Sequence, residues 1–152
     1  MQNLNSANTT RQNQAINILV VDDSRVTQEL LVALLAAQEY QVKVAGNGKR
    51  ALEIIQKSPL PDLVLLDINL PDIDGYEVCR RIKESSLTSE IPVIFVTAES
   101  TQDSEAYGLQ LGAADYITKP ISSAITLLRV RNQILLKQNT REHLFLSSFP
   151  KT

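Results

Sequence analysis

Short apolar runs recur along the chain and alternate with longer segments of helical period. Five of these runs are rich in Val, Ile and Leu, residues that favour strands. They cover 16–21 (INILVV), 42–45 (VKVA), 62–67 (DLVLLD), 91–97 (IPVIFVT) and 115–118 (DYIT). The first, third and fourth runs are apolar on both faces, as in parallel strands that helices cover on both sides. The pattern therefore predicts a fivefold βα repeat.

The segments after the strands predict five helices. The first is expected at 25–38, with an apolar stripe made of Val26, Leu30, Ala33, Leu34 and Ala37. The others are expected at 49–57, 76–85, 102–111 and from about Ser122 to about Lys137. Residues suited to capping precede the first four helices: Asp23 or Ser24, Asn47, Asp74, and Ser100 or Thr101.

Alternating strands and helices predict an α/β fold, a doubly wound five-stranded parallel sheet of the flavodoxin-like (βα)5 type. With right-handed crossovers, such a sheet has few sensible strand orders, and ligands bind at the carboxyl ends of strands where the order reverses, as it does in the order 2-1-3-4-5. That point lies between strands one and three. Asp22 and Asp23 follow strand one and Asp67 follows strand three, so the sequence predicts an acidic site there.

Composition fits one folded domain. The chain has 152 residues, 43% of them hydrophobic, which is enough for one sizeable core. Residues 1–15 are mostly Asn, Gln, Ser and Thr and are expected to form a disordered tail. The folded domain is expected at 16–137, and 138–152 are expected to be a C-terminal extension or the start of a linker.

Charge and cysteine content exclude several classes of function. The 15 basic and 17 acidic residues give a formal net charge of −2, which does not favour nucleic-acid binding or a polybasic membrane patch. No apolar run approaches the roughly 20 residues that span a bilayer. The single Cys79 excludes an internal disulfide, and the N-terminus lacks the apolar core of a signal peptide. A cytoplasmic protein is expected.

The three acids Asp22, Asp23 and Asp67 indicate more about function as a group than each does alone. Alone, each could be a helix cap or a turn residue. Unpaired carboxylates roughly 5 Å apart repel by about 3 kcal/mol at an effective dielectric constant near 20, so a cation must offset the repulsion. Mg²⁺ takes such oxygen ligands and completes its shell with water and phosphate oxygens. The cluster therefore indicates a site for Mg²⁺ and a phosphoryl group.

Thr97 and Lys119 end strands four and five and complete this polar edge. A hydroxyl and an ammonium group can both hold phosphoryl oxygens. Taken singly, Thr97 could be an ordinary strand end and Lys119 a solvated charge.

Four motifs together resemble the receiver domain of two-component response regulators. They are VVDDS (20–24), LLDINLPDIDGYE (65–77), VTAES (96–100) and GAADYITKPI (112–121). The resemblance covers about 16–137, and the combination is highly specific. Chemotaxis receivers also have the strand order 2-1-3-4-5, so the resemblance implies the same order that the βα pattern allows.

The resemblance implies a role for each residue of the site. Asp67 would be the phosphoacceptor, taking a phosphoryl group from the histidine of a sensor histidine kinase or a histidine phosphotransfer domain. Asp23, Asp67 and the backbone carbonyl of Asn69 would bind Mg²⁺, while Asp22 would hold a metal-bound water. The chain would then not be an enzyme, beyond catalysing its own phosphotransfer and autodephosphorylation.

Lys119 would pair with Asp67 in the free state and with the phosphoryl group in the loaded state, and Thr97 would donate its hydroxyl. The Lys119–Pro120 peptide bond is expected to be cis. Tyr116, expected beside Thr97 on strand five, occupies the switch position of the family. Phosphorylation would move Thr97 and then Tyr116, and would change the face of residues 102–134 for a partner or a second copy. An ordinary half-buried Tyr is the alternative.

Asn69 and Glu99 resemble the pair that flanks the attacking water in fast-resetting chemotaxis receivers, which implies a short-lived acyl phosphate. They could also be two solvated polar residues. A histidine kinase is expected to dock around 25–30 and the loop after Lys119.

Two other functions fit the sequence less well. A phosphatase of the haloacid dehalogenase type needs a second Asp two residues after its nucleophile, where this chain has Asn69. A receiver-like interaction module that works without phosphorylation is also less favoured, because every phosphorylation group is present.

The output of the domain stays open. The segment after Lys137 is too short for a DNA-binding or catalytic domain, so the chain is either a single-domain receiver or the N-terminal piece of a longer protein. The stretch RVRNQILLK resembles links from receivers to kinase or diguanylate cyclase domains. Apolar positions 127, 128, 130 and 134–136 could pack in a dimer, or the helix could simply lie on the sheet.

Overall fold

Five parallel strands form one sheet in the computed structural model, which describes residues 15–147 and side chains as far as residue 139. The strands are β1 (Asn17–Val21), β2 (Gln41–Ala45), β3 (Leu63–Leu66), β4 (Val93–Thr97) and β5 (Asp115–Thr118). Their order is β2-β1-β3-β4-β5, which confirms the predicted fold. Almost all of the predicted N-terminal tail (1–14), and residues 148–152 of the predicted extension, lie outside the described residues.

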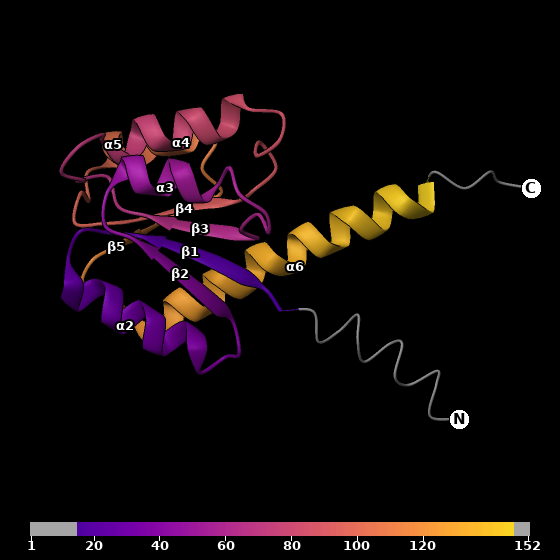
Figure 1. The fold of residues 1–152 in the computed structure, drawn as a ribbon, viewed down its shortest axis with the longest axis horizontal. Coiled ribbons are helices and arrows are strands. Elements are labelled where there is room, and N and C mark those ends of the chain that lie inside the picture. The colour runs from indigo at the N-terminus through magenta and orange to yellow at the C-terminus, as the bar shows by residue number, and fades with distance from the viewer. Residues whose placement is uncertain (1–14, 148–152) are drawn as a thin grey trace, which may run out of the picture.

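Helices cover both faces of the sheet (Figure 1). They are α2 (Arg25–Ala36), α3 (Gly48–Ile54), α4 (Gly75–Glu84), α5 (Gln102–Gln110) and α6 (Ser123–Ser147). In the ribbon, α2 and α6 lie on one face, and α3, α4 and α5 lie on the other. Within the described part of the chain, no helix combines the length and the apolar character needed to cross a membrane.

The core has two layers because side chains alternate along each strand. Ile18 and Val20 of β1 face the α2 and α6 layer, while Leu19 and Val21 face the α3, α4 and α5 layer. All four are buried. Since both faces of β1 and β3 are covered, these strands are continuous apolar runs, and their polar residues appear only where each strand ends.

The rotation of α2 differs from the prediction. Leu31 and Leu35 are its buried residues, whereas Val26 and Leu30 of the predicted stripe are exposed, with 77% and 43% of their surface accessible. Leu30, Leu31, Leu34 and Leu35 form two adjacent apolar stripes, so periodicity alone fits either rotation. The stripe that packs on the sheet lies one position later than expected.

Helix boundaries shift by a few residues. Ser24 caps α2, and α2 ends at Ala36 rather than at residue 38, because the turn that follows includes Glu39 in the left-handed region, with φ of 66°. Asn47, Asp74 and Thr101 cap the next three helices, as predicted. The short helix α3 starts at Gly48 and ends at Ile54, three residues before its expected end.

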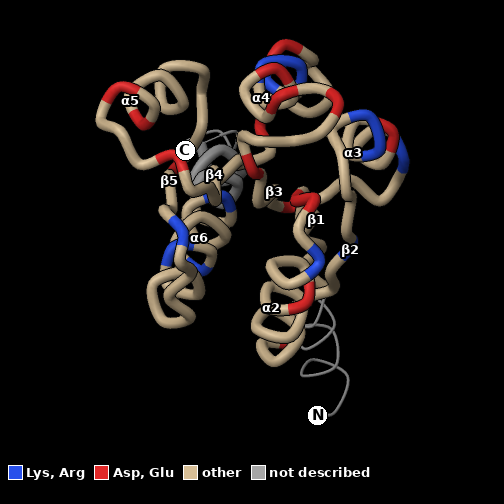
Figure 2. The backbone as a smooth tube through the Cα atoms, turned by 90° about the vertical axis from the view of Figure 1, so that its left-hand side faces the viewer, with Lys and Arg blue, Asp and Glu red and all other residues tan. Residues whose placement is uncertain are grey.

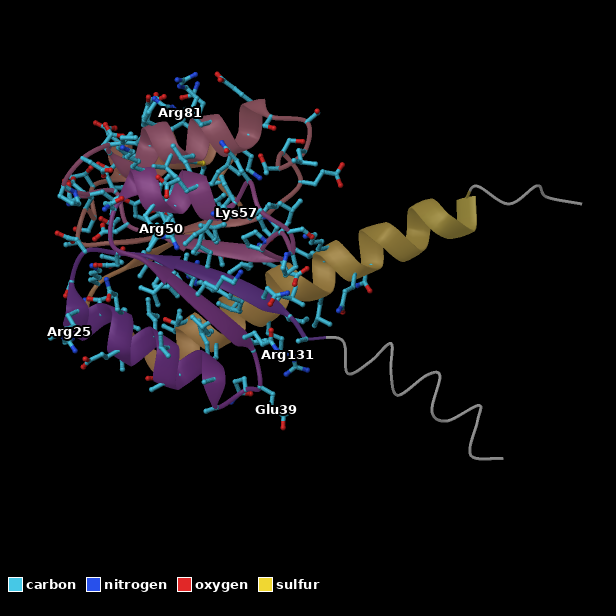
Figure 3. The ribbon with its side chains drawn as sticks, viewed as in Figure 1. Arg25, Glu39, Arg50, Lys57, Arg81 and Arg131 are labelled. Atoms are coloured by element: carbon cyan, nitrogen blue, oxygen red, sulfur yellow. The ribbon has the colours of Figure 1, made fainter. Side chains whose placement is uncertain are left out.

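The last helix is longer than predicted. Val130 and Ile134 of α6 are buried against the sheet, and the helix continues to Ser147 rather than ending near Lys137. Figure 1 shows this second half running out past the edge of the sheet. The six charged residues that Figure 3 labels are all exposed.

Candidate functional site at the carboxyl edge of the sheet

Strand register brings the predicted acids together. Val21 of β1 pairs with Leu66 of β3, so Asp22 and Asp67 both follow the last paired residues. The Asp67 amide donates to the Val21 carbonyl oxygen at 2.9 Å, which extends the ladder by one step. Figure 2 is viewed toward this edge and shows acidic positions gathered where β1 and β3 end. The topology thus places the two acids side by side.

Asp22, Asp23 and Asp67 form a compact acidic cluster. One carboxylate oxygen from each lies within 4.8 Å of the others. Asp22 and Asp67 are buried, with 1% and 5% of their surface accessible, while Asp23 is exposed. Oxygen ligands at this spacing, with one side open to solvent, suit Mg²⁺. The residues present therefore fit the divalent cation that the sequence predicts.

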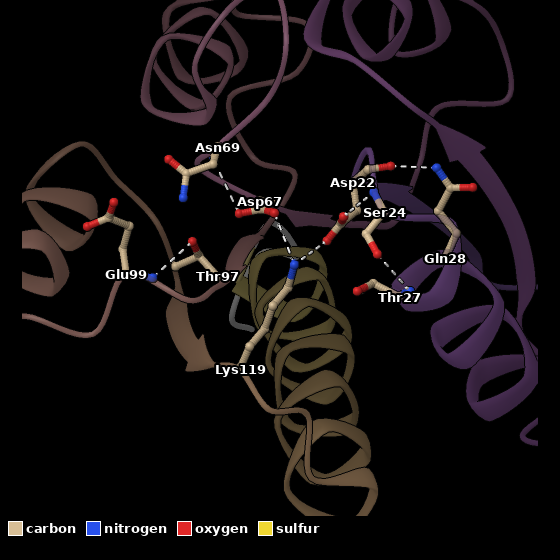
Figure 4. A network of polar contacts seen from close by, with 9 residues as sticks. All are labelled: Asp22, Ser24, Thr27, Gln28, Asp67, Asn69, Thr97, Glu99 and Lys119. Atoms are coloured by element: carbon tan, nitrogen blue, oxygen red, sulfur yellow. Dashed lines mark hydrogen bonds and ion pairs between the residues drawn. The ribbon is translucent and has the colours of Figure 1, made fainter.

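Lys119 lies between the two buried acids (Figure 4). Its Nζ donates to Asp22 Oδ2 at 2.8 Å and to Asp67 Oδ2 at 3.0 Å. The pair with Asp67 was predicted, and the pair with Asp22 was not. The Lys119 amide donates to the Thr97 carbonyl oxygen at 2.8 Å, and the Lys119–Pro120 peptide bond is cis. These contacts hold the ammonium group against the acids.

Burial and ion pairing act in opposite directions on these groups. Burial raises the pKa of Asp22 above its usual value, although hydrogen bonds from Lys119 and the Ser24 amide oppose the rise. Burial alone would lower the pKa of Lys119, but its hydrogen bonds to Asp22 and Asp67 outweigh burial and raise that pKa. Lys119 therefore stays charged and offsets part of the repulsion between the acids.

The start of α2 fixes the position of Asp22. Asp22 Oδ1 accepts the Ser24 amide at 2.8 Å, and the Asp22 carbonyl oxygen accepts Gln28 Nε2 at 2.5 Å. Sequence reasoning missed Gln28. The sequence feature that could have indicated Gln28 is its place as a polar residue in the first two turns of the helix that follows the acids. Many exposed helix positions share that feature.

Residues 68–74, termed the acceptor loop here, follow Asp67 directly. The Asn69 amide donates to Asp67 Oδ1 at 3.2 Å. The Ile68 carbonyl oxygen accepts the Gly75 amide at 2.7 Å and the Leu70 amide at 3.1 Å. A Cβ on Gly75 would lie 2.1 Å from the Asp67 carbonyl oxygen, so glycine is required at this close approach.

Thr97 ends β4 and Glu99 follows it by two residues, and Figure 4 shows both on the same side of Asp67 as Asn69. Thr97 is buried, and its Oγ1 accepts the Glu99 amide at 3.3 Å. Because Oγ1 is the acceptor in this contact, and no hydrogen bond donated by it is seen among the described residues, the Thr97 hydroxyl can donate to a further group.

Tyr116 is linked to the same turn, but its strand neighbour differs from the prediction. It pairs with Phe95, whereas Thr118 is the residue that pairs with Thr97. The expected position beside Thr97 is therefore wrong by two residues, one full step along the same face of the strand. The Tyr116 hydroxyl donates to the Glu99 carbonyl oxygen at 2.6 Å. Burial raises its pKa to about 12, so the hydroxyl keeps its proton near neutral pH.

Comparisons with known proteins agree on one family. Residues 18–131 match the family model of the response regulator receiver domain. Over 115 residues, 76% of this chain and 25% of the relative, the chain is 42% identical to the response regulator PleD of Caulobacter vibrioides. Over 122 residues, 80% of this chain and 27% of the relative, it is 44% identical to a Vibrio cholerae protein described as a probable cyclic di-GMP phosphodiesterase. The chain thus spans about a quarter of the length of these curated relatives.

The fold also resembles a crystal structure of an activated receiver. The BeF3-activated N-terminal receiver domain of RstA from Klebsiella pneumoniae superposes with a TM-score of 0.70 at 33% identity. The match covers 78% of this chain and 97% of that domain.

Proposed function

The chain belongs to the response regulator receiver domain family of two-component systems, and from this premise we propose that it is a phosphoacceptor that takes a phosphoryl group on Asp67. The observation that carries the proposal is the buried Asp67 carboxylate, which is paired with Lys119 inside an acidic cluster suited to Mg²⁺. An interaction module that no longer takes phosphate would have no need for all of these groups together.

The transfer is a displacement at phosphorus. A carboxylate oxygen of Asp67 attacks the phosphorus atom of a phosphohistidine, a P–O bond forms, and the P–N bond breaks with its electron pair left on the imidazole nitrogen. The product is an acyl phosphate on this chain. Because Asp67 is consumed in each transfer and regenerated by hydrolysis, the chain acts as a self-catalysed acceptor rather than as an enzyme on a separate substrate.

Asp23, Asp67 and the backbone carbonyl of Asn69 would hold Mg²⁺, with Asp22 orienting a water beside it. Bound there, the ion would neutralise charge on the phosphoryl oxygens. Lys119 has its ammonium group 3.0 Å from Asp67 Oδ2 and would follow the negative charge onto the phosphoryl group. Thr97 would donate its free hydroxyl hydrogen to a phosphoryl oxygen.

Contacts of Thr97 and Tyr116 with the turn at Glu99 support a conformational switch that responds to phosphorylation. Thr97 Oγ1 accepts the Glu99 amide, and the Glu99 carbonyl oxygen accepts the Tyr116 hydroxyl. A Thr97 side chain that turns toward a phosphoryl group would release the Glu99 amide and shift the turn that Tyr116 holds. The face of residues 102–134 would then change for a partner or a second copy of the chain.

The phosphoryl donor would be a sensor histidine kinase or a histidine phosphotransfer domain. The exposed Val26 and Leu30 of α2 lie on the helix that follows Asp22 and Asp23. Apolar surface beside a phosphoryl site is suited to docking a donor, and it accounts for two large apolar side chains left in solvent.

The test of the function is intact-mass spectrometry after incubation with acetyl phosphate. We expect one phosphoryl adduct with Mg²⁺ present and none with excess EDTA, because the acidic cluster repels an incoming phosphate unless a cation is bound. Failure with acetyl phosphate and also with a phosphorylated histidine phosphotransfer domain would overturn the proposal in favour of a phosphorylation-independent module.

The lifetime of the acyl phosphate depends, in this proposal, on Asn69 and Glu99. Figure 4 shows both on the Thr97 side of Asp67, the side opposite Asp22, where they could flank an attacking water. We expect Asn69→Arg, by its bulk, and Glu99→Ala, by loss of the carboxylate, to slow the decay of the adduct several-fold. Decay is followed by intact mass after the donor is removed. Unchanged decay in both variants would show two ordinary solvated residues.

A further inference from the structure

Asp72, an exposed acid at the tip of the acceptor loop, bonds to a different segment of the chain. Its Oδ1 accepts the Gly48 amide at 2.8 Å, and its Oδ2 accepts the Lys49 amide at 2.9 Å. Both amides belong to the first turn of α3, more than 20 residues earlier in the chain. The two oxygens of one carboxylate thus bridge the loop and the helix, and none of the chemistry proposed above uses this contact.

Close packing beside Asp72 brings the same two segments together. A Cβ on Gly48 would lie 2.9 Å from Val78 Cγ2 and 3.1 Å from both Ile73 Cβ and the Ile73 carbonyl oxygen. The lack of a side chain at Gly48 therefore lets the start of α3 approach the loop closely enough for two short hydrogen bonds.

The acceptor loop is held at its base and at its tip. At its base, the Ile68 carbonyl oxygen accepts the Gly75 amide at 2.7 Å, and the Asn69 amide donates to Asp67 Oδ1 at 3.2 Å. At its tip, Asp72 holds it to α3. The hydrogen bonds from the Lys49 amide, and then from the Gly48 amide, lower the pKa of Asp72, which is consistent with an ionised carboxylate in this bridge.

We propose that Asp72 is a positioning residue, which holds the acceptor loop in the conformation that presents Asn69 to the Mg²⁺ site beside Asp67. Asn69, whose amide bonds to Asp67 at the base of the loop, lies three residues before Asp72 at the tip. A loop that is already ordered does not lose conformational freedom when the cation binds, so affinity is higher. The inference rests on the proposed function only for the role of Asn69 as a Mg²⁺ ligand.

Two simpler explanations for Asp72 make different predictions. In the first, Asp72 does no more than stabilise α3, and the loss of any other cap of that helix would weaken Mg²⁺ binding equally. In the second, the negative charge of Asp72 does no more than attract the cation from a distance. The exact position of the carboxylate would then not matter, and added salt would reduce the contribution of Asp72 to Mg²⁺ affinity.

Asn47→Ala is the matched control for helix stability. Asn47 Oδ1 accepts the Arg50 amide at 2.7 Å, so this variant also removes a hydrogen bond from the first turn of α3. Asn47 makes no hydrogen bond to residues 68–74 among the described contacts. Asp72→Glu is the control for charge, since it keeps the carboxylate but moves it by one methylene.

Two measurements on the full chain separate these explanations. Titration calorimetry with Mg²⁺ gives the affinity, and hydrogen–deuterium exchange of the Mg²⁺-free protein gives the order of residues 68–74. For Asp72→Ala we expect about tenfold weaker Mg²⁺ binding, as for other groups that orient metal ligands, and faster exchange in the loop. For Asn47→Ala we expect a comparable loss of thermal stability with wild-type Mg²⁺ affinity and wild-type exchange in the loop.

Asp72→Glu should resemble Asp72→Ala, because the longer side chain cannot place both oxygens on the two amides. Wild-type Mg²⁺ affinity in Asp72→Glu, or weakened affinity in Asn47→Ala, would overturn the positioning role. Loop exchange needs neither a phosphoryl donor nor Mg²⁺. If the wild-type chain formed no adduct while Asp72→Ala still loosened the loop and weakened Mg²⁺ binding, the proposed function would fail and the positioning role would stand.

Discussion

Asp67→Asn is expected to abolish the phosphoryl adduct while the chain stays folded. An amide nitrogen or oxygen is a far weaker nucleophile than a carboxylate oxygen, and Asp67 is the acid that combines burial, the Lys119 contact and a place at the end of β3. Lys119 keeps its second partner, Asp22, at 2.8 Å, so the ammonium group is not left unpaired. Intact mass after acetyl phosphate treatment measures the loss.

The matched control is Asp103→Asn, in the first turn of α5 and exposed. It makes the same chemical change at an exposed acid outside the cluster of Asp22, Asp23 and Asp67, and we expect a wild-type amount of adduct. An adduct that survives Asp67→Asn and maps to another acid would contradict the assignment of Asp67. Thermal denaturation of both variants checks that neither result reflects unfolding.

Gly75→Ala is expected to cost about 3 kcal/mol or more of the free energy of unfolding, at the upper end for overpacking. The new Cβ would lie 2.1 Å from the Asp67 carbonyl oxygen and 2.7 Å from Ile68 Cα. Both are backbone atoms, so no side chain can rotate away. Either α4 or the acceptor loop must shift, and the Gly75 hydrogen bond to Ile68 is strained in both cases.

A loss of this size lowers Tm by roughly 10 °C in a domain of about 150 residues, which calorimetry detects easily. Gly46→Ala is the control, because its Cβ would meet only Gln28 Nε2, at an ordinary 3.8 Å. We expect a change in Tm of no more than a few degrees there. Equal Tm values for Gly75→Ala and the wild type would show that the close approach at Gly75 is not a constraint.

Much of the fold was predictable because apolar runs with both faces buried leave few arrangements. The alternating pattern gave five strands, and the order β2-β1-β3-β4-β5 followed from crossover rules and the family resemblance. Asp22, Asp23, Asp67 and Lys119 were placed at one edge because the carboxyl ends of parallel strands meet there.

The remaining differences depend on three-dimensional packing. Leu30 and Leu31 are equally apolar, so hydropathy could not select which of them faces the sheet. The contact of Lys119 with Asp22 depends on the path that the Lys119 side chain takes between the two acids. Asp72 bonds to Gly48 across 24 residues, and no local pattern in the loop indicates such a partner. The register that pairs Tyr116 with Phe95 is also a property of the sheet rather than of either strand.

The length of α6 has a mechanical consequence. At 1.5 Å per residue, its 25 residues extend about 37 Å, and its start follows Lys119 by only a few residues. A rigid rod anchored near the acceptor acts as a lever arm: a tilt of about 5° at Ser123 moves the other end, at Ser147, by roughly 3 Å. Such a displacement exceeds the tolerance of about 0.5 Å within which functional groups must be held. The same tilt moves Ile134, which is buried against the sheet, by about 1.4 Å, so a small adjustment of the packing there becomes a larger translation at the far end of the helix.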